Sequence, residues 1–169
     1  MKRRKFLVRT SLASSVGLFF PSLLPGLNID PEFRKKRPAQ NLDKDTVITV
    51  TVDTATVNAD INEAVIISDN RSENSGLANS FLSEIDKMKK VIWQGQSESG
   101  DEVWITKIER KGGAQLLKKD VYTGSTTVEG KVKDKYIDGV ESYNIYFTVV
   151  SGGVESSYVI DPKLQMNPS

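Results

Sequence analysis

Two glycine-marked segments have residue types that occur in catalytic loops. Gly124 to Val132 resembles a phosphate-binding P-loop, but five residues rather than four separate its glycines, and Val132 stands where Ser or Thr should hold Mg²⁺. Gly95 to Gly100 resembles the Gly-x-Ser-x-Gly turn of hydrolases with one residue too many. Without His, such a hydrolase would need a Lys base, and no Ser-x-x-Lys occurs. We expect a strand at the first segment and a loop at the second.

The chain contains no Cys and no His, which removes whole classes of chemistry. Zinc, haem and iron–sulfur sites lose their usual ligands, and nucleophilic dyads and triads lose their usual base. A bound metal would have to be a hard ion such as Ca²⁺ or Mg²⁺, held by oxygen atoms. We therefore predict no cofactor, no metal, no catalytic residue and a protein that is not an enzyme.

Two loops carry enough oxygen-bearing side chains to be considered for Ca²⁺. These side chains belong to Asp134, Asp138 and Glu141 around Gly139, and to Asp69, Asn70 and Glu73 in the second loop. The first loop departs from an EF-hand because Tyr136 occupies the third position, where an acid or amide is needed. We predict solvated turns at both places.

The adjacent carboxylates Asp101 and Glu102 raise the hypothesis of a carboxylate-dependent hydrolase acting on envelope sugars. Glycosidases need two acidic groups at a defined separation across a cleft, and nothing in the sequence places a partner opposite this pair. Four aromatic residues could line a sugar-binding face, namely Trp93, Trp104, Tyr122 and Tyr146. Aromatic residues at alternate strand positions more often belong to the core. The binding site therefore stays unknown, and hydrolysis remains an alternative.

The first 27 residues are typical of an export signal or membrane anchor. A basic segment precedes a short apolar stretch, which is the layout of a secretory signal. Within it, Arg3, Arg4, Phe6 and Leu7 match the twin-arginine pattern. No clean cleavage site follows, so an uncleaved anchor is the alternative. Residues 28–45 contain a second basic cluster and read as a flexible linker.

Charge is divided unevenly along the chain, although its formal net charge is only +1. Nine of the 23 Lys and Arg residues, but only two of the 22 Asp and Glu residues, lie in residues 1–42. This segment therefore carries +7 and the remainder −6. Binding to nucleic acid needs clustered positive charge, so we predict no nucleic-acid partner for the acidic part.

From residue 46 onward the sequence predicts a β-rich domain. Apolar and polar residues alternate in Thr46–Asp53 and again in Tyr143–Val150, as in half-buried strands. Glycines 152 and 153 suit the tight turn of a hairpin. Apolar residues recurring from Leu77 to Met88 predict one short helix. The further predicted strands are 64–67, 90–95, 103–110, 116–122, 126–132 and 158–160.

About eight closely spaced strands with one helix favour an antiparallel, immunoglobulin-like β-sandwich. We place this domain at residues 46–164 and a tail at 165–169. Four segments of the domain resemble the bacterial inclusion-body proteins of the PixA and AidA type. They are Val50–Thr54, Val91–Trp93, Tyr143–Phe147 and Tyr158–Pro162. The resemblance implies a β-sandwich with no established catalysis.

These observations lead to a functional expectation. We predict an exported, non-enzymatic protein with a structural, assembly or binding role at the bacterial envelope, in the periplasm or at the cell surface. Its expected partners are the twin-arginine or general export machinery and a protein or glycan, with the membrane contacted only through the leader. Self-association, as in a cytoplasmic inclusion-body-type protein, is the first alternative.

Overall fold

The computed structural model describes residues 44–72 and 75–168 of the 169-residue chain. The predicted export-signal residues Arg3, Arg4, Phe6 and Leu7 lie outside this part, as does Glu73.

The described residues form one short helix and eleven strands. In chain order they are β1 (Thr46–Val52), α1 (Ile61–Ala64), β2 (Val65–Asp69), β3 (Ser75–Leu77), β4 (Leu82–Ile85), β5 (Lys90–Ser97), β6 (Glu102–Gly113), β7 (Val121–Thr123), β8 (Val128–Lys131), β9 (Val140–Ser151), β10 (Val154–Ile160) and β11 (Lys163–Met166). The domain is therefore mainly β, as predicted.

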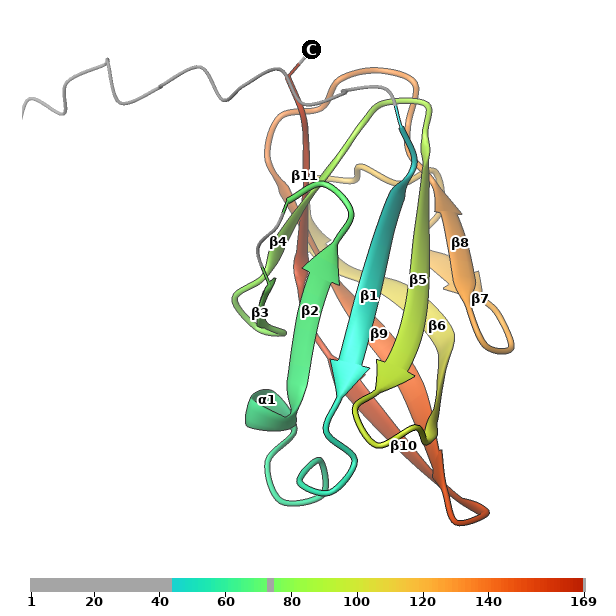
Figure 1. Ribbon diagram of the computed structural model, residues 1–169. Helices are drawn as coiled ribbons and strands as arrows, with labels where there is room; N and C mark the ends of the chain where they lie inside the picture. Colours follow the sequence, from blue (N-terminus) through green and yellow to red (C-terminus); the bar gives the residue numbers. More distant parts are fainter. Residues whose placement is uncertain (1–43, 73–74, 169) are drawn as a thin grey trace, which may run out of the picture. The chain divides into compact units, whose positions relative to one another are not determined.

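The strands make two sheets that pack face to face in a sandwich-like arrangement (Figure 1). The five-stranded sheet has the order β3-β2-β1-β5-β8, and the six-stranded sheet has the order β4-β11-β9-β6-β7 with β10 also paired to β9. Alternate residues of the longer strands point between the sheets, so the alternation seen in the sequence becomes an apolar core. Its largest fully buried side chains are those of Trp93, Tyr143 and Phe147.

Both sheets are mixed, which corrects the prediction of a purely antiparallel sandwich. β1 pairs parallel with β5, and β4 pairs parallel with β11. Parallel neighbours need a long crossover connection. Between β1 and β5 the chain forms β2 and β3 in the same sheet and then β4 in the other sheet. Alternation within one strand does not encode the direction of its neighbour.

The predicted helix over Leu77–Met88 is wrong. Leu77 ends β3 and Ile85 ends β4, and the four residues between these strands include one turn in which Phe81 N donates to Leu77 O. Leu77 and Met88 are exposed by 45% and 61%, so the supposed apolar stripe is not one buried face. β4 is held instead by β11, about eighty residues later in the chain.

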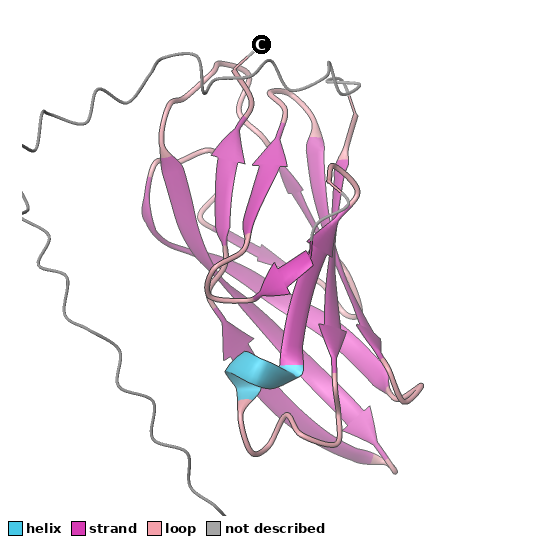
Figure 2. Cartoon of the chain, turned by 60° about the vertical axis from the view of Figure 1, so that its left-hand side comes forward, coloured by secondary structure: helices cyan, strands magenta, loops and turns pink. Residues whose placement is uncertain are grey.

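The helix among the described residues is α1, which we did not predict from the sequence and whose last residue, Ala64, was assigned to the predicted strand at 64–67 (Figure 2). It has four residues, and the side chain of its N-cap residue Asp60 accepts a hydrogen bond from the Asn62 N–H.

The predicted C-terminal hairpin is confirmed. Ser151 pairs with Val154 across a two-residue turn, and Gly152 and Gly153 have φ angles of 58° and 81°. Residues with a Cβ rarely adopt positive φ angles, which explains why glycine occupies both positions. The chain then enters β11, which extends to the buried Met166. Of the predicted strand at 116–122, only Val121 and Tyr122 lie in a strand, which is β7 (Val121–Thr123).

Candidate interaction surfaces

The outer face of the five-stranded sheet presents a continuous uncharged surface. The register places its side chains in three rows across the strands. The rows are Leu77-Ile66-Thr51-Gln96, then Ser75-Ser68-Thr49-Gln94, then Val47-Ile92. None of these ten residues is charged, although 27% of the chain is, and none is buried. We call this surface the threonine–glutamine face.

Hydrogen bonds between neighbouring strands hold the centre of the threonine–glutamine face in place. Gln94 Nε2 donates to Thr49 Oγ1 over 3.2 Å, and Gln96 Nε2 donates to Thr51 Oγ1 over 2.9 Å. Charge borders the face at Lys90, the first residue of β5, and at Glu129, which lies opposite Ile92 on β8, and these two residues form a 2.8 Å ion pair. The face can therefore contact a partner at little electrostatic cost, since no charge must leave water.

The sequence contains a signal for this face that we did not use. In residues 47–51 and 92–96, the outward-facing alternate positions carry no charged residue; they are Val47, Thr49, Thr51, Ile92, Gln94 and Gln96. An exposed strand face usually carries charges, so two uncharged alternating segments mark a surface. That the two segments lie side by side follows only from the β1–β5 pairing.

The outer face of the six-stranded sheet is different in character. The Lys107 ammonium lies 3.8 Å from the ring centroid of Tyr146, and both groups contact the Glu109 carboxylate, at 3.0 Å and 2.7 Å. Hydrogen bonds from Tyr146 and Lys107 lower the pKa of Glu109. Trp104 Nε1 donates to Glu102 over 2.8 Å. These polar groups satisfy one another and form a charged, internally paired surface.

The four aromatic residues considered for sugar binding do not form one face. Trp93 is fully buried, and its Nε1 donates to the Tyr143 hydroxyl. The Tyr122 hydroxyl accepts from the Lys119 N–H and packs against the core. Trp104 and Tyr146 are half-buried on the outer side of the six-stranded sheet. Trp93 therefore belongs to the interior, and the half-buried Tyr122 packs against it from the edge of the core.

Asp101 and Glu102 face different partners. The Asp101 carboxylate accepts hydrogen bonds of 2.6 Å from both Ser99 and Thr54, which lower its pKa. Glu102 instead accepts from Trp104. A carboxylate held ionised by hydroxyl donors is a poor general acid. The arrangement stabilises the loop between β5 and β6 and does not resemble a glycosidase pair.

The two glycine-marked segments have structural explanations. Gly124 to Val132 contains β8, and a Cβ at Gly130 would lie 2.9 Å from the Trp93 ring. Gly95 to Gly100 contains the end of β5 and a loop in which Ser97 Oγ donates to the Asp101 carbonyl. Glycine at 130 thus makes room for the core.

The calcium candidates do not converge. In the first loop Asp134 pairs with Lys118, Asp138 accepts from its neighbour Gly139, and Glu141 is buried against the backbone of Leu116 and Leu117. In the second, Asp69 accepts from the N–H groups of two following residues and Asn70 bonds to β1. Within residues 44–72 and 75–168, no group of three acidic residues is placed to hold a metal ion.

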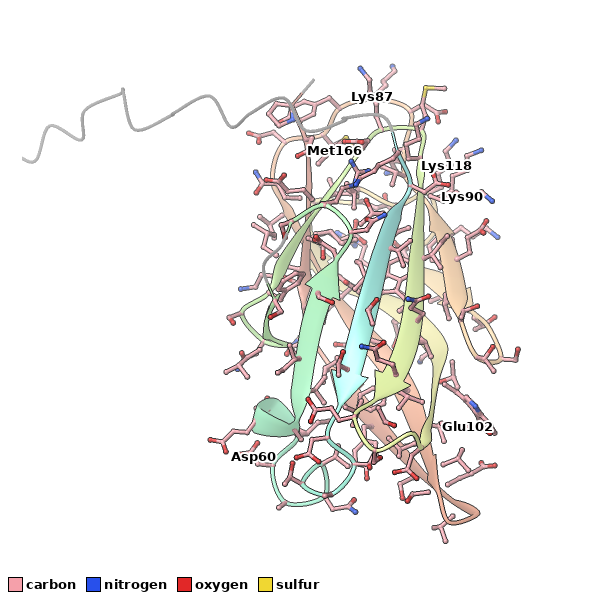
Figure 3. The ribbon with its side chains drawn as sticks, viewed as in Figure 1. Asp60, Lys87, Lys90, Glu102, Lys118 and Met166 are labelled. Carbon is pink, nitrogen blue, oxygen red and sulfur yellow. The ribbon has the colours of Figure 1, made fainter. Side chains whose placement is uncertain are left out.

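Charged side chains lie near both ends of the sandwich, and Lys90 and Lys118 pair with the acidic residues Glu129 and Asp134. Lys87, Lys90 and Lys118 lie near one end, and Asp60 and Glu102 lie near the other (Figure 3). Among the residues described, no helix has the length and hydrophobicity of a membrane span.

Comparison with solved structures supports the resemblance drawn from the sequence. The chain is similar to the crystal structure of the inclusion body protein PixA from Burkholderia cenocepacia, with a TM-score of 0.55 and 16% sequence identity. The match covers 78% of this chain and 99% of that one. No protein-family model matches the sequence, and the comparison with curated proteins finds no match. At this identity the similarity concerns the fold.

Proposed function

We propose that this chain is an exported, non-enzymatic protein with a structural, assembly or binding role at the bacterial envelope. The observation that supports this role is the threonine–glutamine face, an exposed surface of ten residues without a charge. Such a surface suits lasting contact with a protein or glycan, because binding removes no ionised group from water. The export part of the proposal depends on Arg3, Arg4, Phe6 and Leu7.

The role of the face can be tested by placing a charge in its centre. Thr49→Lys should release the protein from the envelope fraction or from its assemblies, because a lysine ammonium would have to be desolvated in the contact. Asn144→Lys is the matched control, since Asn144 lies on the outer face of the other sheet. Loss of association in both variants, or in neither, would argue against a role of this face.

The proposed export and cellular location can be tested by cell fractionation and by measuring the intact mass of the protein. We expect a periplasmic or surface protein whose export fails when Arg3 and Arg4 are both changed to Lys. A full-length cytoplasmic protein that the change does not affect would contradict the export proposal.

That second outcome would favour the alternative, a cytoplasmic self-assembling protein of the inclusion-body type. The fold similarity to PixA supports this alternative.

The immunoglobulin-like strand order stays a prediction. Hydrolysis of envelope sugars has the least support, because Asp101 and Glu102 are engaged with different partners.

A further inference from the structure

The β9–β10 hairpin ends in the longest sheet edge among the described strands. β10 has seven residues, whereas β3, β4, β7 and β8 at the other sheet edges have three or four. On the side away from β9, no described strand pairs with β10. In Figure 1 the hairpin also reaches beyond the end of the five-stranded sheet. A long free edge is a template for pairing with another strand.

β10 lacks the usual protection of such an edge. Its sequence contains one charge, Glu155, with no Lys and no Pro, and its register with β9 is unbroken. Val154 and Val159 are exposed by 66% and 47%. Natural edge strands are commonly blunted by lysine, proline or a bulge. Helix α1 and the segment before it also contact β10, where the Tyr158 hydroxyl donates to Asn58 from the strand face that carries the buried Ile160.

The register identifies which backbone groups point away from β9. Ser151 and Val154 close a two-residue turn and so exchange hydrogen bonds, and such pairs alternate with non-bonded pairs along an antiparallel ladder. The N–H and C=O groups of Glu155, Ser157 and Val159 therefore point outward. The 3.2 Å contact between the Ser157 and Thr148 hydroxyls agrees with a non-bonded pair, in which side chains approach closely.

We propose that two copies of this chain pair through β10, antiparallel and with Ser157 facing the partner's Ser157 across a two-fold axis. In this register Glu155 faces the partner's Val159, so the only charge of the strand does not meet its own copy. A two-fold interface brings each surface against itself, and a strand with a single off-centre charge is self-complementary in this sense. The two six-stranded sheets would then become continuous.

This pairing names a partner for the assembly role proposed above and rests on that role, but it uses a different surface. Pairing along one strand buries less area than standard interfaces of about 800 Å² per partner. We therefore expect a weak dimer that forms at high protein concentration.

Single cysteines test the register directly, because the chain has none of its own. Bonded antiparallel neighbours have Cα atoms about 5.5 Å apart, within disulfide range. Ser157→Cys should give a disulfide-linked dimer under mild oxidation of the full chain. In Glu155→Cys, the two cysteines of the dimer would be separated by about 14 Å along the strands. This variant should therefore give at most about a tenth as much disulfide-linked dimer as Ser157→Cys. Equal yields from both variants, or no dimer from Ser157→Cys, would overturn the proposal.

A backbone variant provides the second measurement, by sedimentation of the full chain. Ser157→Pro removes the outward N–H and keeps the ladder to β9, since proline is tolerated at a free edge. It should weaken the dimer at least about tenfold, because both central hydrogen bonds are lost. Ser157→Ala should leave it unchanged. A dimer insensitive to proline would contradict the pairing. If the unsubstituted chain forms no dimer while its envelope association is intact, this inference alone is overturned.

Discussion

The core contains one polar contact between its two largest side chains. Trp93 Nε1 donates to the Tyr143 hydroxyl over 3.1 Å, both side chains are fully buried, and their rings meet edge to face. Burial raises the pKa of Tyr143 far above its usual range, so the phenol stays neutral. The bond links β5 of one sheet to β9 of the other.

We expect Tyr143→Phe to destabilise the domain by about 1–3 kcal/mol, because the buried indole N–H loses its acceptor. Trp93→Phe should cost more, since a larger side chain is replaced and a cavity forms. In a double-mutant cycle measured by urea unfolding, the combined variant should lose less than the sum of the two. Strict additivity would show that the hydrogen bond contributes nothing.

Glu141 is a second buried group with a measurable signature. Its Oε2 accepts from the backbone N–H groups of Leu116 and Leu117, which fixes the segment between β6 and β7, and its Oε1 has no hydrogen-bond partner among the described residues. Desolvation raises the pKa of this carboxyl, while the two N–H groups and Arg110 partly oppose the rise.

A raised pKa in the folded state means that folding favours the protonated form. The contribution of Glu141 to stability should therefore be full below its ordinary pKa of 4.5 and be lost as pH rises through its raised value. Glu141→Gln keeps the acceptor oxygen and should flatten this part of the pH profile of the free energy of unfolding. Asp101→Asn is the control. The pKa of Asp101 is lowered, so its contribution to the free energy of unfolding changes only at pH values below its ordinary pKa of 3.8. An unchanged profile in Glu141→Gln would contradict the expectation.

At the scale of the elements, β5 and β6 lie close together at Gly95. A Cβ there would lie 2.5 Å from both Val103 Cγ1 and the Val103 carbonyl oxygen. Since a backbone atom cannot easily move aside, Gly95→Ala should destabilise the domain by roughly 1–3 kcal/mol.

Gly112→Ala is the matched comparison within β6, because a Cβ there meets nothing within 4 Å. It should change the free energy of unfolding by at most about 0.5 kcal/mol. Thermal unfolding of both variants measures the difference, and similar melting temperatures would show that the two strands can separate without cost.

At the scale of the whole domain, a buried ion pair ties distant parts of the chain together. Arg71 Nη1 lies 2.5 Å from Asp86 Oδ2, and both side chains are buried. Arg71 also donates to Thr46 at the start of β1, and Asp86 accepts from Asn167 near the C-terminus. Four chain segments therefore meet at this pair.

Arg71→Met should cost about 3–5 kcal/mol, because Asp86 would remain charged and buried without its partner. The exposed pair of Lys111 and Asp161 provides the control, and Lys111→Met should cost at most about 1 kcal/mol. Replacing Arg71 and Asp86 together by Met and Leu should recover most of the loss, as measured by chemical denaturation. No recovery would mean that the four-segment geometry, rather than the lone charge, carries the cost.

The sequence by itself determined the elements whose pattern is local. Side chains alternate along a strand wherever it lies, so β1, β5, β6, β9 and the glycine turn before β10 were predictable. Composition alone likewise shows that sites built on Cys or His lack their usual ligands and bases in this chain. The prediction of a helix from Leu77 to Met88 was wrong because a few apolar residues can match the spacing of a helix as well as that of a strand. Pairing with the distant strand β11 made Leu82–Ile85 a strand.

Only the tertiary structure decided which strands are neighbours, and with that every candidate surface. The parallel pairing of β1 with β5 brings Thr49 beside Gln94 and creates the threonine–glutamine face. The pairing of β9 with both β10 and β11 leaves β10 with one edge to which no described strand pairs. The physical reason is that strand pairing depends on contacts between residues far apart in the chain, whose free energy no local pattern records.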